Sequence, residues 1–159
     1  MKRIILFRHG KSSWNLPVND IDRDLEKSGK ERTQKSAEEL KKKINFKIDA
    51  WFSSPAIRAR KTAEIAAGYF DNNKIKINDS FYTFSFFDLL KEIKKLDDEI
   101  GTVIIFGHNE AFTEFVNRMG SHYLDNLPTS GVAVLEFDSR NWSQIEKGET
   151  KLIIKPKNL

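Results

Sequence analysis

The chain has 159 residues, of which 39% are hydrophobic and 31% charged, and its formal net charge is +4 at pH 7. This composition excludes a disordered chain, and the length favours one domain over residues 1–159. The sequence contains no cysteine, which excludes disulfides and thiolate metal sites.

Apolar runs and helical periodicity predict an alternation of strands and helices. The predicted strands cover residues 3–7, 48–53, 75–77 and 102–106, and the predicted helices cover residues 29–44, 56–70, 84–96 and about 110–119. Ser54 is expected at the N-cap of the second helix, with Pro55 at its first position. In the third helix, Phe87, Leu90 and Ile93 share one face with Leu96.

This order predicts an α/β fold. Parallel strands need crossover connections, so the alternation implies a three-layer αβα sandwich with a mainly parallel central sheet. The β-branched runs 132–137 and 151–154 predict an antiparallel hairpin at the C-terminal edge of that sheet.

Two of the three histidines directly follow predicted strands. His9 comes after the run that ends at Phe7-Arg8, and His108 follows Phe106-Gly107. Because ligands bind at the carboxyl ends of parallel strands, both imidazoles are expected in one crevice. The alternative is that each is a hydrogen-bonded loop histidine, which is the more common case for a single one. His122 lacks this context and is expected to be structural or exposed.

Two arginines accompany these histidines. Arg8 precedes His9, and Arg58 lies in the first turn of the helix after Pro55. A guanidinium donates two parallel hydrogen bonds and stays charged, so arginine is well suited to hold phosphate. Ser12 follows closely enough to donate to the same phosphate, although serine in such a loop more often forms a turn.

Three motifs in this order resemble the histidine phosphatase superfamily, also called the phosphoglycerate mutase-like group. They are Arg8-His9-Gly10, the run from Ser53 to Ala63, and Gly107-His108-Asn109. Within the superfamily, residues 8–14 and 22–29 in so short a chain are most similar to the phosphohistidine phosphatase branch. The resemblance covers residues 1 to about 137.

The resemblance implies a function and a site. His9 is expected to attack phosphorus and become phosphohistidine, while Arg8, Arg58 and His108 hold the phosphoryl oxygens. Phosphoryl transfer depends mostly on positioning and positive charge, which these groups supply, so no metal or cofactor is expected. His9 must be neutral to attack and His108 is useful when protonated, so we expect their pKa values to be pushed apart.

The sequence departs from the family at the general acid. Many superfamily members have a glutamate after the third strand, but the comparable stretch, residues 79–88, contains none. An imidazole that leaves phosphohistidine can depart neutral and needs less help than an alkoxide. Asp20, Asp22 and Glu110 are candidate substitutes. Asp22 more often orders a loop, however, and Glu110 more often complements a helix start.

The aromatic residues near this stretch have two possible roles. Trp14, Tyr82 and several phenylalanines between residues 81 and 87 could wall the cleft, although the core is the more common place for phenylalanine. No long insertion suggests a lid, so the cleft is expected to be open to a phosphate carried by a protein.

We therefore expect a metal-independent phosphatase whose substrate is a phosphorylated protein that carries phosphohistidine. The alternatives are a small-molecule phosphomonoesterase for a sugar or nucleotide phosphate, and a phosphoprotein-binding module without turnover. Phosphate or sulfate is expected to bind in the site. Basic and acidic residues are interleaved without a nucleic-acid-binding signature, and no apolar run approaches a membrane span, so we expect a cytoplasmic protein without nucleic-acid or membrane partners.

Overall fold

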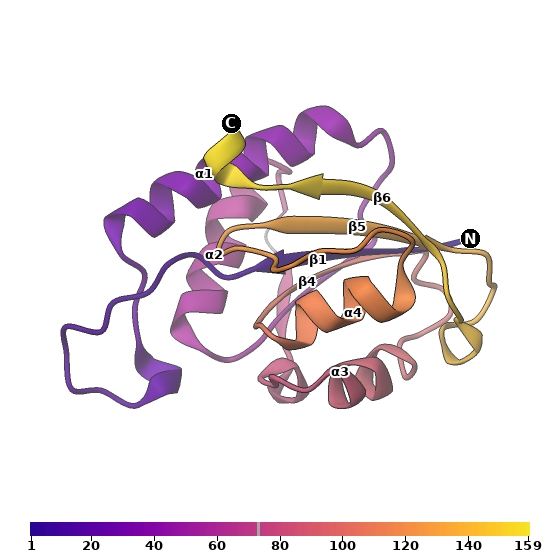
Figure 1. Ribbon diagram of the computed structural model, residues 1–159, viewed down its shortest axis with the longest axis horizontal. Coiled ribbons are helices and arrows are strands. Elements are labelled where there is room, and N and C mark those ends of the chain that lie inside the picture. The colour runs from indigo at the N-terminus through magenta and orange to yellow at the C-terminus, as the bar shows by residue number, and fades with distance from the viewer. Residues whose placement is uncertain (73) are drawn as a thin grey trace.

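The computed structural model describes residues 1–72 and 74–159, which form an α/β fold (Figure 1). The strands are β1 (Lys2–Arg8), β2 (Ala50–Ser53), β3 (Ile75–Ile77), β4 (Thr102–Gly107), β5 (Val132–Phe137) and β6 (Glu149–Ile154). The α-helices are α1 (Lys27–Lys43), α2 (Ile57–Gly68), α3 (Phe86–Ile93) and α4 (Ala111–Met119). A short 3₁₀ helix, η1 (Asp20–Asp22), lies in the long loop between β1 and α1.

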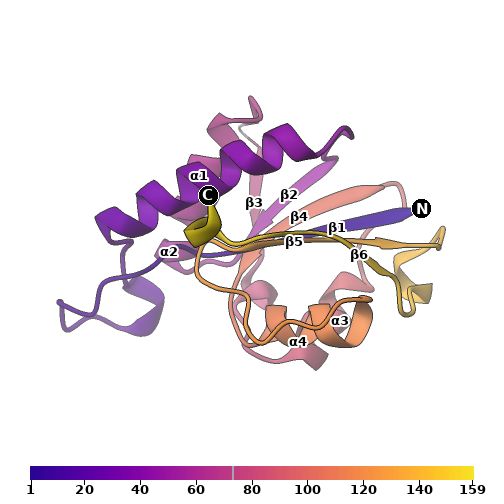
Figure 2. The same ribbon diagram turned by 45° about the horizontal axis from the view of Figure 1, so that its top comes forward.

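The strands form one six-stranded sheet in the order β3-β2-β4-β1-β5-β6. The strands β3, β2, β4 and β1 are parallel, whereas β5 is antiparallel to both β1 and β6. Helices α1 and α2 cover one face and α3 and α4 the other (Figure 2). The predicted three-layer fold and the antiparallel C-terminal edge are therefore confirmed.

The two central strands, β1 and β4, are buried on both faces. Ile5 and Phe7 face the core under α1 and α2, while Ile4 and Leu6 face the core over α3 and α4. This two-sided burial explains why β1 is a continuous apolar run rather than an alternating one. On α2, the small residues Ala63, Ala66 and Ala67 let the helix pack closely on the sheet.

All four helices differ from their predicted bounds by up to three residues, and α2 and α3 also differ in the predicted roles of their side chains. Helix α2 has Ala56, not Ser54, at its N-cap position, and the hydroxyl of Ser54 is used elsewhere. Helix α3 begins after Ser85, whose side chain accepts from the backbone N–H of Asp88, and it ends at Ile93. With this start, Phe86, Leu89 and Ile93 form the buried face of the helix, and Phe87 is exposed rather than sharing a face with Ile93.

Among residues 1–72 and 74–159, no helix combines the length and the apolar character that a membrane crossing requires.

Candidate active site

The two strand-end histidines lie side by side. His9 follows β1 and His108 follows β4, and the register of these neighbouring parallel strands pairs Arg8 with Gly107. The backbone N–H of His9 donates to the Gly107 carbonyl at 3.1 Å. Their ring centroids are 5.2 Å apart, so the structure brings the two imidazoles together as the sequence predicts.

Hydrogen bonds define the tautomer of His9. Its Nδ1 lies 2.7 Å from the carbonyl oxygen of Gly10, which can only accept, so Nδ1 carries the proton. Its Nε2 accepts from Nε of Arg58 at 3.4 Å. Because a guanidinium keeps its protons, Nε2 must be unprotonated. The lone pair of Nε2 is therefore directed into the space next to Arg58.

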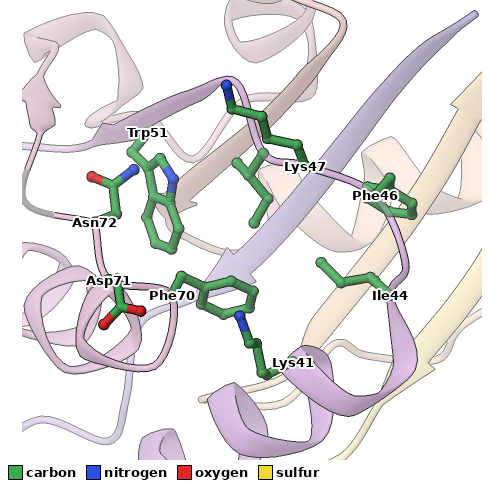
Figure 3. Close-up of a pocket in the computed structure, with 9 residues that line it drawn as sticks. Lys41, Ile44, Phe46, Lys47, Trp51, Phe70, Asp71 and Asn72 are labelled. Carbon is green, nitrogen blue, oxygen red and sulfur yellow. The ribbon is translucent and has the colours of Figure 1, made fainter.

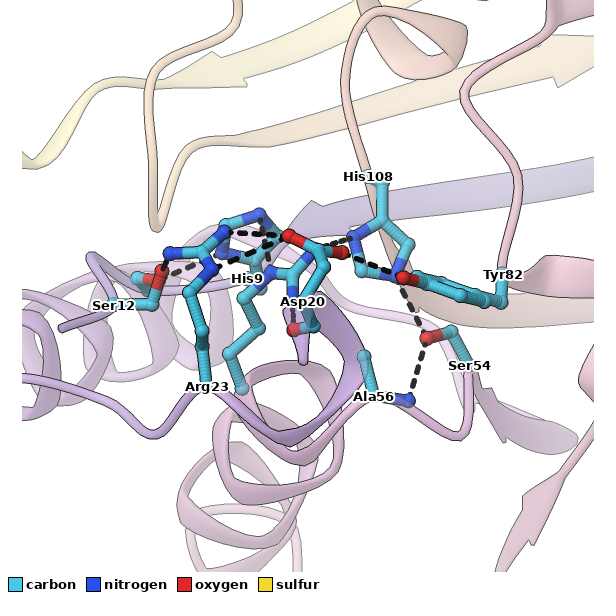
Figure 4. Close-up of polar contacts among 10 residues, drawn as sticks. His9, Ser12, Asp20, Arg23, Ser54, Ala56, Tyr82 and His108 are labelled. Carbon is cyan, nitrogen blue, oxygen red and sulfur yellow. Dashed lines mark hydrogen bonds and ion pairs between the residues drawn. The ribbon is translucent and has the colours of Figure 1, made fainter. Parts of the chain in front are cut away.

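His108 has the opposite tautomer. Its Nδ1 accepts from Nη2 of Arg58 at 3.4 Å, which leaves the proton on Nε2. Nε2 lies 2.7 Å from Oγ of Ser54 and donates to it, and the same hydroxyl accepts from the N–H of Ala56 at 3.1 Å (Figure 4). These two bonds explain why Ser54 does not act as the N-cap of α2.

Both histidines are held neutral. Burial lowers the pKa of His9 to about 3, and the charge of Arg58 adds to this effect despite the bond to Gly10. Burial also lowers the pKa of His108 to about 2, with further contributions from His9 and Arg58. The prediction that the two pKa values are pushed apart, with His108 protonated, is wrong for the protein alone. Burial and positive neighbours act on both rings in the same direction.

Arg58 lies at the centre of the polar network. It projects from the first turn of α2 and is only 1% exposed. Besides the two histidines, it contacts Asp20 twice, through Nη1 to the backbone oxygen at 2.6 Å and through Nη2 to Oδ2 at 2.9 Å. The buried guanidinium is thus paired with a carboxylate, which offsets the cost of removing its charge from water.

Asp20 connects η1 to two further side chains. Its Oδ1 accepts from Nη2 of Arg23 at 3.1 Å, and its Oδ2 accepts from the Tyr82 hydroxyl at 2.6 Å (Figure 4). Burial opposes ionisation of Asp20, but the hydrogen bonds from Tyr82 and Arg58 outweigh it and hold the pKa of this carboxyl well below its usual range. Asp20 is therefore ionised at neutral pH and poorly suited to donate a proton.

Arg8 has a different set of partners. Its Nη1 donates to the backbone oxygen of Leu127 at 2.7 Å, and its buried Nε has no hydrogen-bond partner among the described residues. Burial lowers the pKa of Arg8, and the charge of Arg58 lowers it further, so the two guanidiniums are close enough to interact. Arg8 thus contributes positive charge to the His9 site.

The remaining predicted residues lie at the edge of this network. Ser12 is buried, and its hydroxyl accepts from Nη1 of Arg23. Asp22 and Glu110 are exposed, and neither forms an ion pair within the part of the chain that the structure describes. His122 is also exposed.

Sequence reasoning missed the hydrogen-bonding roles of Arg23, Tyr82 and Ser54, although Tyr82 was expected as a possible wall of the cleft. Arg23 was part of the motif that indicated the phosphatase branch, but no role was assigned to it. Tyr82 lies in the stretch that was searched for a glutamate, and Ser54 was expected only to cap a helix. A search for any hydrogen-bonding side chain in these motifs would have included all three.

The aromatic residues divide between the site and the core. The rings of Tyr82 and Phe84 lie 5.2 and 5.4 Å from the ring of His108, centroid to centroid. Phe81 and Phe86 are buried in the core next to α3 and α4. Tyr82 and Phe84 therefore lie beside His108, and their role as a wall of the substrate cleft stays a prediction.

A separate pocket of about 300 Å³ lies near the start of β2, at the opposite end of that strand from Ser54 (Figure 3). Its lining includes Lys41 and Lys47 together with the rings of Trp51 and Phe70. None of the predicted site residues lines it. Among residues 1–72 and 74–159, no group of three histidine or acidic side chains is arranged to bind a metal ion.

Comparison with known proteins identifies the family. Residues 4–89, more than half of the chain, match the model of the histidine phosphatase superfamily, branch 1. An uncharacterized chloroplastic protein of Arabidopsis thaliana is 28% identical over 155 residues, which cover 90% of this chain and 70% of the relative.

Solved structures show the same fold. A protein of Agrobacterium tumefaciens, assigned as a phosphohistidine phosphatase SixA, has a TM-score of 0.80 at 24% identity, with 98% of each chain covered. A protein histidine phosphatase SixA complexed with tungstate has a TM-score of 0.80 at 20% identity, also with 98% of each chain covered. The chain therefore belongs to branch 1 of the histidine phosphatase superfamily, has the phosphoglycerate mutase-like fold, and is a phosphatase of that superfamily.

Proposed function

We propose that this histidine phosphatase transfers a phosphoryl group from phosphohistidine on a protein to Nε2 of His9, and then to water. The observation that carries the proposal is the 2.7 Å hydrogen bond from His9 Nδ1 to the Gly10 carbonyl, which leaves Nε2 unprotonated. A neutral imidazole nitrogen beside the Arg58 guanidinium is arranged to attack a phosphoryl group that the guanidinium binds.

In the first step, the lone pair of His9 Nε2 forms a bond to phosphorus while the P–N bond to the substrate imidazole breaks. Negative charge on the phosphoryl oxygens is balanced by Arg58 and Arg8. Nδ1 of His108, which faces Arg58, becomes a further donor when the phosphoryl charge favours the protonated ring. The ring of His9 gains positive charge on phosphorylation, and its Nδ1–H bond to Gly10 stabilises that charge.

In the second step, a water oxygen bonds to phosphorus and the bond from phosphorus to Nε2 breaks. One water proton is released and the other leaves with inorganic phosphate, so His9 returns to its starting tautomer. The exposed edge of the site, where Asp20 is 42% exposed, gives water access to the intermediate.

The leaving group is the reason to favour phosphohistidine. Residues 79–88 contain no glutamate, and the Asp20 carboxyl is held ionised by Tyr82 and Arg58. An alkoxide leaves slowly without a proton donor, whereas an imidazole protonated on its other ring nitrogen leaves as a neutral molecule. A site without a general acid is therefore better suited to breaking a P–N bond than a P–O bond. The relative with bound tungstate, a phosphate-like oxyanion, is itself a protein histidine phosphatase.

The test compares two peptides of the same sequence, one carrying phosphohistidine and the other phosphoserine. We expect kcat/KM for the phosphohistidine peptide to be higher by about 10²-fold or more. This factor is what a general acid usually contributes, and only the phosphoserine peptide needs one. His9→Asn should abolish turnover of both peptides, and an alkaline quench followed by mass spectrometry should find the phosphoryl group on His9 of the wild type.

Two outcomes would contradict the proposal. A preference for phosphoserine or a sugar phosphate would identify a small-molecule or alkyl phosphomonoesterase instead. Tight phosphate binding without turnover, and without phosphorylated His9, would identify a phosphoprotein-binding module.

A further inference from the structure

Exposed apolar side chains are concentrated on two short segments. Of the ten large hydrophobic residues that are exposed among the described residues, five lie within residues 14–18 and 84–87. We name these five the apolar rim: Trp14 (76% exposed), Leu16 (68%), Val18 (45%), Phe84 (53%) and Phe87 (64%). The other five are distributed along the rest of the chain, so the concentration on nine residues calls for a physical reason.

The apolar rim is joined to the site by direct contacts. The guanidinium carbon of Arg23 lies 3.6 Å from the ring centroid of Trp14, and Arg23 is paired with Asp20. Asp20 accepts from Tyr82, whose ring lies 5.7 Å from that of Phe84. These contacts run from the loop after β1 to the start of α3 across the mouth of the His9 site.

Packing within the chain accounts for only part of the rim. Phe84 contacts His108 and Phe87 contacts Phe86, yet both rings remain more than half exposed. In the segment that precedes and opens α3, Phe81 and Phe86 already fill the core, while Phe84 and Phe87 face outward. Trp14 is the most exposed large hydrophobic side chain of the described residues, although a ring of its size is usually well buried. Exposed apolar side chains gathered on two segments that are linked through one site indicate an interaction surface, and aromatic residues are enriched where partner proteins bind most strongly.

We propose that the apolar rim is the docking surface for the protein that carries the phosphohistidine, and that this partner is folded and has apolar side chains around its phosphorylated residue. The inference rests on the proposed function. The positive charge next to the rim agrees with it, because Arg23 contacts Trp14 of the rim and both Arg23 and Arg58 pair with Asp20, and guanidiniums match a phosphoryl dianion. The rim supplies binding away from the reacting atoms, which lowers KM without changing the chemical step.

The test uses the double variant Leu16→Ser/Phe87→Ser. Trp14 and Phe84 are left unchanged because they contact Arg23 and His108. The matched control is Tyr123→Ser/Ile77→Ser, which removes two other exposed apolar side chains that lie outside the rim segments. The probes are a folded domain phosphorylated on a surface histidine that has apolar neighbours, and the free amino acid phosphohistidine.

We expect the rim variant to lose about tenfold or more in kcat/KM for the phosphorylated domain, through KM, as removal of interface anchors does. Hydrolysis of free phosphohistidine should be unchanged, and the control variant should match the wild type with both probes. An unchanged KM for the domain, or an equal loss with both probes, would overturn the docking proposal while leaving the proposed function intact.

Two further results would contradict the docking proposal in other ways. If the wild type hydrolyses neither probe, the proposed function fails and the docking proposal fails with it. If sedimentation shows that the wild type is a dimer and the rim variant a monomer, the rim joins copies of this chain, and docking of a phosphoprotein is refuted.

Discussion

The buried neutral histidines make a specific prediction about stability below pH 7. An unfolded histidine takes up a proton near pH 6.5, but burial holds the pKa of His9 at about 3 and that of His108 at about 2 in the folded chain. Between these limits the unfolded state binds more protons, so the free energy of unfolding must fall as the pH decreases below about 6.5.

The magnitude follows from these pKa values. Each pH unit below the unfolded pKa costs about 1.4 kcal/mol per histidine, so at pH 5 each ring costs about 2 kcal/mol and the pair about 4 kcal/mol. Such a loss is a large part of the stability of an ordinary domain. The Asp20 carboxyl contributes little in this window, because its lowered pKa affects stability only where an unfolded aspartate becomes protonated, near pH 4 and below.

The assay is urea denaturation at pH 7, 6 and 5, in buffers without phosphate or sulfate, because an anion that binds the folded chain would raise its stability. His9→Asn and His108→Gln cannot be protonated, so each should remove about half of the pH dependence, and the double variant nearly all of it. His122→Gln, at an exposed position, is the control. A wild-type stability that is flat between pH 7 and 5, or a double variant that keeps the full slope, would refute the reasoning.

Three other predictions concern single side chains. Arg58→Gln should lower kcat/KM for a phosphohistidine peptide by about 10³-fold, since it removes a buried charge that faces the phosphoryl oxygens, whereas Arg60→Gln on the exposed side of α2 should change it little. A loss of less than tenfold would show that Arg58 is not a main ligand. Asp20→Asn should tighten the binding of inorganic phosphate by about tenfold, as measured by calorimetry, because it removes a negative charge that is paired with Arg58. Weaker binding would mean that the Asp20 carboxylate positions Arg58 for the anion. Phe106→Ala should cost about 3–5 kcal/mol in urea denaturation, because the ring is fully buried and stacks on Phe7; a cost near zero would contradict this packing.

The sheet and the pairing of the histidines were predictable because they depend on strong local signals. The apolar runs over residues 3–7 and 102–106 can only be strands buried on both faces, and each ends directly before a histidine. That β1 and β4 are neighbours was an assumption, and the parallel register Arg8 to Gly107 confirms it. A single strand inserted between them would have separated the rings.

The network around Asp20 could not be predicted in the same way. Asp20 and Tyr82 are far apart in the sequence, and both lie at short turns in long connections whose course no periodicity reveals. The charge state of His108 could not be predicted either, because the sequence shows which residue types follow a strand but not how deeply their side chains are buried. The lowered pKa of that ring is due first to burial.

These charge states bear on how the site would respond to substrate. With both rings neutral, Arg58 is paired mainly with Asp20, a carboxylate that occupies donors suited to a phosphoryl oxygen. A phosphoryl dianion placed against Arg58 competes with Asp20 for those donors, and its charge favours the protonated form of His108. The imidazolium expected from the sequence is then a property of the complex with phosphate. Binding of sulfate, whose own charge does not change between pH 8 and 6, should therefore take up a proton wherever the pKa of His108 in the complex exceeds the pH, and its affinity should then rise as the pH falls.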